Sequence, residues 1–363
     1  MSINKALTST LLTDGPRLRE FESEFAKYTG AKYAVGVSNA TSALHLALKS
    51  LDIGTGDEVI VPDLTFVATA NAILLTGATP VLADVDDDLN ISVESVKSSL
   101  TKKTRAILPV HLTGQVCKIK EVMQIARNND LAVIEDCAHA IGSKLNDKHV
   151  GTFGDSGCFS FYPTKNITTI EGGMIITNSK KIAEYASTAR NHGITKSLLQ
   201  RYSHGKPWEY DVIEPGYNYR LDEIRSSLGL SQLDMITKWN LLRKKAFEYY
   251  NKKLSKIEGL ITPNVIKNTQ HSYHLYILRI HEKFGLSRDE VFKKLLKAGI
   301  RTSVHYKPLD EFTIFKKKAK RIADLKNTKK LYKEIISLPL FPNITKREQD
   351  HVIDCLLKLD RAS

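Results

Sequence analysis

The order of apolar and amphipathic segments is the feature that most limits what this 363-residue chain can fold into. Between residues 34 and 178, short apolar runs alternate with segments in which apolar residues recur every three or four positions. This alternation is typical of a mostly parallel sheet with helices on both faces, an α/β fold. The pattern predicts strands at 34–38, 58–62, 79–85, 105–111, 131–136, 157–162 and 173–178, and helices at 42–51, 67–77 and 119–130.

The second half of the chain has a different organisation. A polar stretch with glycine and proline, Ser203–Tyr217, precedes a long helical pattern that begins near Leu221. Beyond that helix, the pattern predicts a strand at 271–280, a helix at 287–300 and a strand at 301–306. We therefore expect a large α/β domain over residues 1–240, including an N-terminal arm, and a smaller C-terminal α+β domain over residues 241–363.

Composition and charge exclude several classes of protein. No segment approaches the ~20 apolar residues of a membrane span, and the first residues lack a signal-peptide core, so we expect a cytoplasmic protein without membrane contact. The four irregularly spaced cysteines argue against a disulfide framework and against a metal site. The net charge is +13, but the basic run at 316–330 lacks interleaved aromatics. We interpret this run as a solvated helix face and expect no nucleic-acid partner.

Polar and aromatic residues follow the predicted strands, where open α/β sheets bind ligands. Thr41 follows the first strand and is expected to cap the next helix, whose free amides can bind phosphate. A simple helix cap is the alternative. Phe66 follows the second strand, where it either joins the core or stacks on a flat ring.

Two further strand ends carry ionisable groups. Asp136 and His139 follow the strand at 131–136, and an aspartate there either pairs with a protonated pyridine nitrogen or caps the next helix. Lys165 follows the strand at 157–162, where burial can lower the pKa of an amine from ~10.4 and make it a Schiff-base nucleophile. An exposed lysine is the alternative. The order of all four features is that of fold type I enzymes that use pyridoxal 5'-phosphate (PLP).

Longer motifs carry a resemblance to one family. They are S-N-A-T-S-A-L-H-L-A-L, G-D-E-V-I-V-P, T-F-V-A-T-A-N-A-I, I-E-D-C-A-H-A-I-G-S, F-S-F-Y-P-T-K-N-I-T-T, R-N-H-G-I, G-Y-N-Y-R-L and S-L-P-L-F-P. With these motifs the chain resembles the nucleotide-sugar aminotransferases of the DegT/StrS family from about Asp14 to about Thr345. The resemblance implies a fold type I PLP-dependent transferase.

The resemblance also implies roles for individual residues. Lys165 matches the lysine that forms the Schiff base with PLP and then carries the proton between cofactor and substrate. Asp136 matches the residue that pairs with the pyridine nitrogen of PLP. His139 matches the residue that lies against the phenolic oxygen of PLP. The remaining cofactor contacts are the phosphate ligands and the stacking aromatic, which correspond to Thr41, Ser42, Ser160 and Phe66.

Members of the family form homodimers with shared active sites, and the resemblance implies the same here. Asn218 matches the asparagine that crosses from the partner to the phosphate. Arg220 is a candidate for holding the carboxylate of the amino donor. His305 and Tyr306 lie where the C-terminal domain of such enzymes approaches the sugar.

The chain departs from the family pattern after the lysine. The turn usually reads T-T-G-E-G-G, but Ile170 replaces its first glycine, so we expect the backbone there to avoid positive φ. Related dehydratases carry histidine in place of the lysine, and Lys165 argues against that branch.

The expected reaction is transfer of an amino group from L-glutamate to a nucleotide-linked keto-sugar. Residues 208–221 resemble members that act on carbon 4, so the expected acceptor is an NDP-4-keto-6-deoxyhexose in surface glycan biosynthesis. A 3-keto-sugar acceptor remains open, as do the nucleotide and the stereochemistry. The rival functions are a PLP-dependent dehydratase or lyase on the same fold, and a non-enzymatic module that binds nucleic acid or an anionic partner.

Overall fold

A large central sheet organises the chain. The computed structural model describes residues 3–195 and 208–360, so positions 203–207 of the expected polar stretch lie outside the described residues. The eight-stranded sheet has the order β1-β9-β8-β5-β4-β2-β3-β13, in which β9 runs antiparallel to its two neighbours and the other pairs are parallel. The strands are β1 (Tyr33–Val37), β2 (Glu58–Pro62), β3 (Thr79–Ala83), β4 (Thr104–Ile107), β5 (Ala132–Asp136), β8 (Ser156–Ser160), β9 (Gly173–Thr177) and β13 (Lys320–Arg321). The prediction of an α/β fold with a large, mostly parallel sheet is confirmed.

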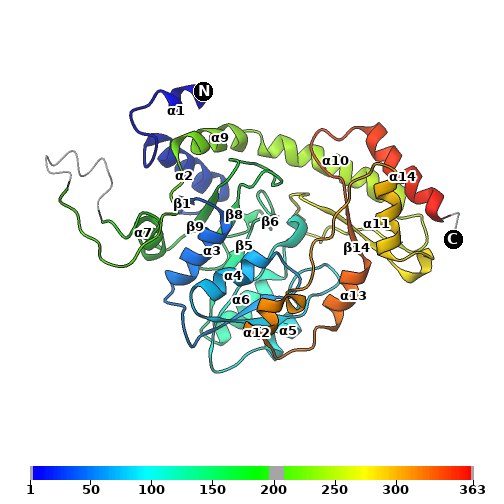
Figure 1. The fold of residues 1–363 in the computed structure, drawn as a ribbon, viewed down its shortest axis with the longest axis horizontal. Helices are drawn as coiled ribbons and strands as arrows, with labels where there is room; N and C mark the ends of the chain where they lie inside the picture. Colours follow the sequence, from blue (N-terminus) through cyan, green and yellow to red (C-terminus); the bar gives the residue numbers. More distant parts are fainter. Residues whose placement is uncertain (1–2, 196–207, 361–363) are drawn as a thin grey trace.

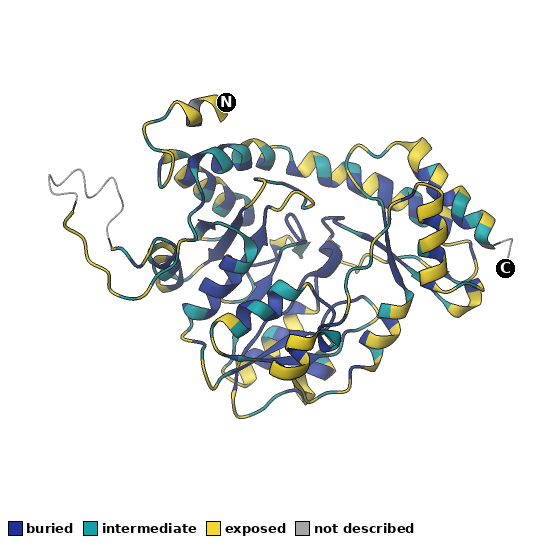
Figure 2. Cartoon of the chain, in the orientation of Figure 1, coloured by how far each residue is buried: buried dark blue, intermediate teal, exposed yellow. Residues whose placement is uncertain are grey.

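Helices cover both faces of this sheet, as Figures 1 and 2 show. Successive side chains of β2 point to opposite faces, so Ile60 belongs to one apolar core and Val59 and Val61 to the other. The first core contains α2 (Pro16–Thr29), α6 (Ile119–Asn128) and part of α5 (Val93–Ser98). The second contains α3 (Ala40–Lys49), α4 (Val67–Leu75) and α7 (Lys180–Ala189).

A smaller unit lies at the right of Figure 1, around the C-terminal end of the helix α10. Its own apolar core joins a three-stranded antiparallel sheet to three helices. The elements of the second half are α9 (Glu223–Leu233), α10 (Ile236–Leu254), β10 (Leu260–Ile261), β12 (Tyr276–Ile280), α11 (Arg288–Lys297), α12 (Thr313–Lys318), α13 (Lys326–Glu334), β14 (Ile335–Leu338) and α14 (Lys346–Asp360). The remaining short elements are α1 (Ile3–Leu7), β6 (Lys144–Leu145), β7 (Lys148–His149), β11 (Thr269–Gln270) and the 3-10 turns at 112–114, 282–284 and 309–311.

The helix α10 connects the two units. Its first residue, Ile236, packs in the core of the large sheet, whereas Phe247 and Tyr250 pack in the smaller core. The boundary near residue 240 stays a prediction. The chain also returns to the large sheet, since β13 pairs in parallel with β3. None of the sequence patterns predicted that return.

Several predicted elements differ in the structure. The single long helix expected from Leu221 is two helices, because Asp234 and Met235 separate α9 from α10. Residues 301–306 form no strand and pair only through a bridge between Ser303 and Ser337. The basic run 316–330 is exposed at its lysines, but it contains β13 between two helices rather than one continuous helix. For residues 301–306 and 316–330, contacts with distant segments override the local pattern.

The turn after Lys165 also contradicts its prediction. Ile170 adopts φ = 70°, in the left-handed region that glycine favours, although it is β-branched. The backbone N–H of Ile170 donates to Thr168 Oγ1 at 2.8 Å, which holds the turn in this conformation. The side chain is 64% exposed and so gains little from packing.

None of the helices in the described ranges 3–195 and 208–360 is long and apolar enough to cross a membrane.

Replacing Ile170 with glycine is expected to raise the free energy of unfolding by roughly 1 kcal/mol, because the left-handed strain disappears. Ile322 is also an exposed isoleucine, but it lacks a positive φ. Ile322→Gly is the matched control and should lower the free energy of unfolding by about 0.5–1 kcal/mol. Chemical denaturation of both variants measures the difference. An equal loss of unfolding free energy in the two variants would contradict the inference that the backbone of Ile170 is strained.

Candidate active site

A cavity of about 550 Å³ opens at the carboxyl ends of the parallel strands. It collects side chains that end or follow β1, β2, β4, β5 and β8, together with one from the second half of the chain. Of the residues singled out in the sequence, it is lined by Thr41, Phe66, Asp136, His139, Ser160, Lys165 and Tyr306.

Lys165 sits in a turn just beyond β8. Its backbone N–H donates to the carbonyl of Tyr162 at 2.9 Å, which fixes the start of the side chain. Burial lowers the pKa of the amine to about 8, while the charge of Asp136 acts in the opposite direction. About a tenth of the amine is therefore neutral, and hence nucleophilic, at pH 7.

Asp136 ends β5 and faces the same cavity. Its Oδ2 accepts a hydrogen bond from the hydroxyl of Thr69 at 2.9 Å, and its Oδ1 accepts one from the N–H of Ala138 at 3.0 Å. Burial raises the pKa of this carboxyl, whereas the two donors and Lys165 oppose the rise. A carboxylate held in this way is suited to pair with a cationic ring nitrogen.

His139 has a hydrogen-bond partner at one ring nitrogen. Its Nε2 lies 3.1 Å from the hydroxyl of Tyr306, and its buried Nδ1 has no hydrogen-bond partner among residues 3–195 and 208–360. Burial lowers the pKa of His139 well below its usual value, so the ring is neutral. An unpartnered, neutral nitrogen beside the cavity fits a polar ligand atom such as a phenolic oxygen.

The N-terminus of α3 forms another wall of the cavity. Asn39 caps this helix, since its side chain accepts the N–H of Ser42 at 2.8 Å; the expectation that Thr41 is the cap was therefore wrong. Thr41 lies in the first turn, where amides have no helical partner. Gly173 passes close beneath, because a Cβ there would lie 2.5 Å from the carbonyl carbon of Asn39. This space around free amides suits a phosphate group.

Other predicted residues lie elsewhere within one chain. The hydroxyl of Ser42 is buried 3.1 Å from that of Ser38. Asn218 is exposed, and its backbone forms an isolated β-bridge with that of Asn191. Arg220 donates to the side-chain oxygen of Asn191 at 2.7 Å, and both residues line a separate small cavity. His305 hydrogen-bonds Ser337 at 2.7 Å, and burial lowers its pKa to about 4, with a further contribution from the charge of Lys165.

The sequence alone missed several residues of the site. Thr69 lies one helical turn after Thr65, and their hydroxyls are 3.0 Å apart, so the i,i+4 spacing of two threonines was the available signal. Tyr162, Thr164 and Glu171 also line the cavity. They flank Lys165 in sequence, but no pattern gave the direction of their side chains.

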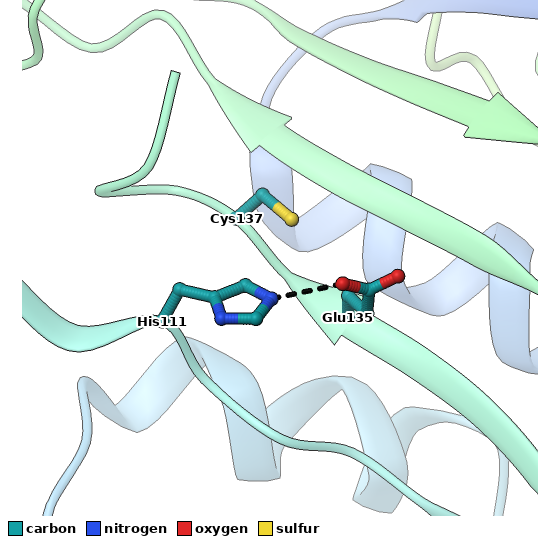
Figure 3. A group of neighbouring side chains, drawn as sticks. All are labelled: His111, Glu135 and Cys137. Atoms are coloured by element: carbon teal, nitrogen blue, oxygen red, sulfur yellow. Dashed lines mark hydrogen bonds and ion pairs between the residues drawn. The ribbon is translucent and has the colours of Figure 1, made fainter. Parts of the chain in front are cut away.

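Glu135, next to Asp136, belongs to a buried group with His111 and Cys137 whose possible ligand atoms lie within 4.8 Å of one another (Figure 3). Cys117 donates its backbone N–H to Nδ1 of His111, so the proton lies on Nε2 and points to Glu135, 2.9 Å away. Burial raises the pKa of Cys137, which keeps it a thiol. The group is thus explained by hydrogen bonding, and its protonation states do not suit a metal ion.

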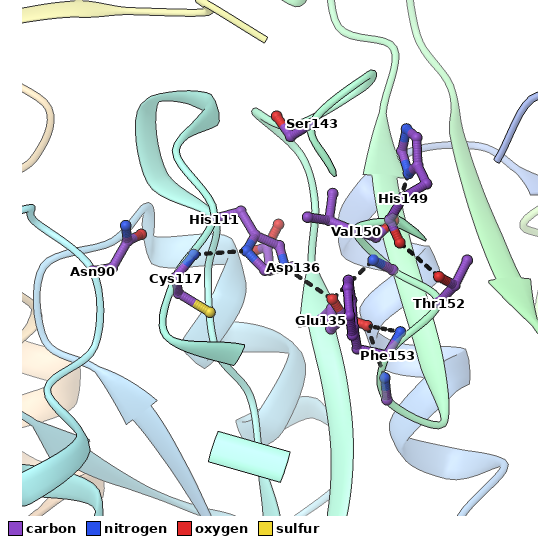
Figure 4. Close-up of polar contacts among 12 residues, drawn as sticks. Asn90, His111, Cys117, Glu135, Asp136, Ser143, His149, Val150, Thr152 and Phe153 are labelled. Atoms are coloured by element: carbon purple, nitrogen blue, oxygen red, sulfur yellow. Dashed lines mark hydrogen bonds and ion pairs between the residues drawn. The ribbon is translucent and has the colours of Figure 1, made fainter. Parts of the chain in front are cut away.

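Glu135 braces the strand that carries Asp136, as Figure 4 shows. Besides His111, it accepts backbone N–H groups of a tight loop at 2.8 Å, from Gly151, Phe153 and Gly154. Burial alone would raise the pKa of Glu135, but these hydrogen bonds and His111 hold it below its usual value. The carboxylate therefore fixes both sides of β5 near its end.

Comparison with known proteins agrees with this geometry. The model of the DegT/DnrJ/EryC1/StrS aminotransferase family matches residues 1–357. The spore coat polysaccharide biosynthesis protein SpsC of Bacillus subtilis is 39% identical over 98% of this chain and 92% of its own length. The chain belongs to this aminotransferase family.

Solved structures of relatives extend the comparison. PseC of Helicobacter pylori, an aminotransferase involved in the biosynthesis of pseudoaminic acid, has a TM-score of 0.92 at 31% identity and covers 99% of this chain and 95% of its own. Spr1654 of Streptococcus pneumoniae has a TM-score of 0.92 at 30% identity in its pyridoxamine-phosphate form, over 99% and 96% of the two chains, and is also known in a PLP form. The protein is a PLP-dependent sugar aminotransferase with the fold type I architecture.

The pKa of Lys165 leads to a testable pH dependence. Only the neutral amine attacks the aldehyde of PLP, so the rate of cofactor capture by the apoenzyme is expected to rise with pH around a midpoint near 8. Stopped-flow absorbance between pH 6 and 10 gives the midpoint. A midpoint near the ordinary lysine value of ~10.4 would show that Lys165 is not held in the cavity.

Proposed function

We propose that this enzyme transfers the amino group of L-glutamate to a nucleotide-linked keto-sugar, an NDP-4-keto-6-deoxyhexose. The observation that carries the proposal is the pairing of Lys165, an amine of lowered pKa, with the buried carboxylate of Asp136 across one cavity. Dehydratase relatives replace this lysine with histidine. The presence of Lys165 therefore favours transamination over the dehydratase reaction, and release of 2-oxoglutarate would distinguish transamination from a lyase reaction.

Each polar group of the cavity has a distinct task in this proposal. PLP, when bound, supplies an electron sink that stabilises negative charge on the carbon bearing the amino group. Asp136 keeps the ring nitrogen protonated, and His139 presents its free nitrogen to the phenolic oxygen. Lys165 holds the cofactor and then moves a proton at its Nζ. The first turn of α3, with Thr41, and Ser160 hold the phosphate.

The acceptor is proposed from the mouth of the cavity and from the motif at 208–221. Phe66 is 54% exposed there, and its ring lies 5.6 Å from that of Tyr306. Such aromatic walls suit the flat face of a sugar ring or of a base. The resemblance of residues 208–221 to members acting on carbon 4 supports a 4-keto-sugar, and carbon 3 is the alternative. A role in building surface glycans in the cytoplasm belongs to the same proposal.

A homodimer with shared sites completes the proposal. Neither Asn218 nor Arg220 lines the cavity of its own chain: the backbone of Asn218 pairs with that of Asn191 in an isolated β-bridge, Arg220 donates to Asn191 Oδ1, and Asn218 is exposed. Exposed apolar side chains lie close by in sequence, at Trp208, Val212 and Ile213. Contact with a second copy would cover this apolar surface and bring Asn218 to the partner's phosphate site.

The first experiment is the visible absorption spectrum of the PLP-loaded enzyme before and after addition of L-glutamate. The yellow band is expected to bleach, with release of 2-oxoglutarate, and a keto-sugar nucleotide should restore it. A band that does not change on addition of L-glutamate would point to another donor or to the dehydratase reaction.

Lys165→Ala is expected to abolish turnover while the protein stays folded. Retained turnover would show that Lys165 does not have its assigned role.

A mixed dimer tests the shared site. One chain of the mixed dimer carries Lys165→Ala and the other carries Asn218→Asp. If Asn218 serves its own chain, each site carries one substitution; if Asn218 acts across the interface, both substitutions fall in one site and the other site is intact. The mixed dimer should then recover about half of wild-type activity, since one of two sites is complete. The two parent homodimers, assayed at limiting PLP, are the controls. Absence of recovery would mean that Asn218 serves its own chain.

A further inference from the structure

A buried hydrogen-bond network connects the second half of the chain to the residue next to Lys165. Asn166 donates from its Nδ2 to Asn240 Oδ1 and to the carbonyl of Ser272, both at 2.7 Å. His274 Nδ1 lies 2.9 Å from Asn166 Oδ1. The side chains of Asn166, Asn240 and His274 are nearly inaccessible to water. None of these contacts belongs to the cavity lining described above.

The network fixes the tautomer of His274. Asn240 donates from its own Nδ2 to the carbonyl of Ile141 at 3.0 Å, so its Oδ1 is an acceptor and Asn166 must place its amide nitrogen there. Both amide hydrogens of Asn166 are then used, and its Oδ1 faces His274 as an acceptor. His274 therefore carries its proton on Nδ1 and donates to Asn166. A buried imidazole in this arrangement has one orientation.

The same imidazole supports His139. The ring centroids of His139 and His274 lie 4.3 Å apart at an angle of 44°. Among the described residues, the hydroxyl of Tyr306 is the hydrogen-bond partner of the His139 ring, and Nδ1 of that ring has none. Ser272 ties the backbone as well, because its hydroxyl donates to the carbonyl of His139 at 2.7 Å. The face contact with His274 is thus a main restraint on the orientation of the His139 ring.

Electrostatics favours a neutral imidazole at this position. Burial lowers the pKa of His274 well below its usual value, and the nearby His139 and Lys165 lower it further. A charged ring here would repel the ammonium form of Lys165. The backbone of the segment is anchored to the large unit, since the N–H groups of His274 and Leu275 both donate to the carbonyl of Thr113.

We propose that His274 is a positioning residue of the active site: its Nδ1–H holds Asn166 beside Lys165, and its ring face holds His139. The inference rests on the proposed function, in which Lys165 carries PLP and His139 contacts it. His274 lies behind these residues and acts through them. Through His274, the C-terminal half of the chain therefore helps to position Lys165 and His139.

Two substitutions separate the two contacts. His274→Phe keeps an aromatic face for His139 but removes the donor to Asn166. His274→Asn keeps a donor at the position of Nδ1 but removes the ring face. Both variants are expected to lower kcat roughly ten- to a hundredfold, because small misplacements of reacting groups are costly. The KM for L-glutamate should change less than about twofold, since His274 does not touch the substrate.

Spectroscopy distinguishes the contacts without turnover. The pKa of the visible band of the loaded enzyme should shift by about half a unit or more in His274→Phe, because Lys165 and its neighbour lose a hydrogen-bond restraint. In His274→Asn this pKa should stay near that of the wild type. Should His274→Phe fail to fold, His274→Gln replaces it, since its amide lies at the position of Nε2 and leaves Asn166 without its donor.

His271→Phe is the matched control. His271 is equally buried in the same segment, but it packs against Phe247 and Tyr273 and hydrogen-bonds within its own segment and to Thr113. The His271→Phe variant should have a lower melting temperature than the wild type, with unchanged kcat and an unchanged pKa of the visible band. Equal spectral and kinetic changes in His271→Phe, or wild-type values in both His274 variants, would overturn the inference. Absence of the visible band in the wild type would instead overturn the proposed function.

Discussion

The active site depends on two consecutive buried carboxylates at the end of β5. Because side chains of a strand alternate between faces, Glu135 points into one layer of the protein and Asp136 into the other. Glu135 accepts four hydrogen bonds, which offset the several kcal/mol that burial of a lone charge would cost. The loop at 151–154 and the segment after β4 that carries His111 are thereby bound to β5, which makes the support of Asp136 rigid. A cofactor partner placed in this way needs little reorganisation when charge develops.

The second half of the chain closes this site rather than standing apart from it. Tyr306 lines the cavity and contacts His139, and the segment around His274 is bonded to the turn at Thr113. The N–H of Asp310 donates to Asp63, which directly follows β2 and precedes Phe66 by three residues. Mutations in the C-terminal half can therefore alter catalysis without touching cofactor or substrate.

The sequence predicted those parts of the structure that repeat or converge. Alternating patterns predict parallel strands, and parallel strands bring their carboxyl ends together, so Asp136, His139 and Lys165 could be placed in one site. The helix cap could not be chosen in S-N-A-T-S, because several residues there can cap a helix and only the backbone decides for Asn39. Ile170 shows the limit of local preference, since its neighbours impose a positive φ that isoleucine disfavours. The Asn166–His274 contact joins residues 108 positions apart and leaves no periodic trace in the sequence.

The short strand β13 places the basic run at 316–330 along the edge of the large sheet. Without Lys320 and Arg321, β3 would form the border of the sheet and expose unpaired N–H and C=O groups to other chains. Lys320 also pairs with the buried carboxylate of Glu58 at 2.5 Å, which fastens this cover to β2. Exposed lysines on both sides then surround the border with like charge. Like charge around an edge strand opposes its pairing with the edge of another sheet.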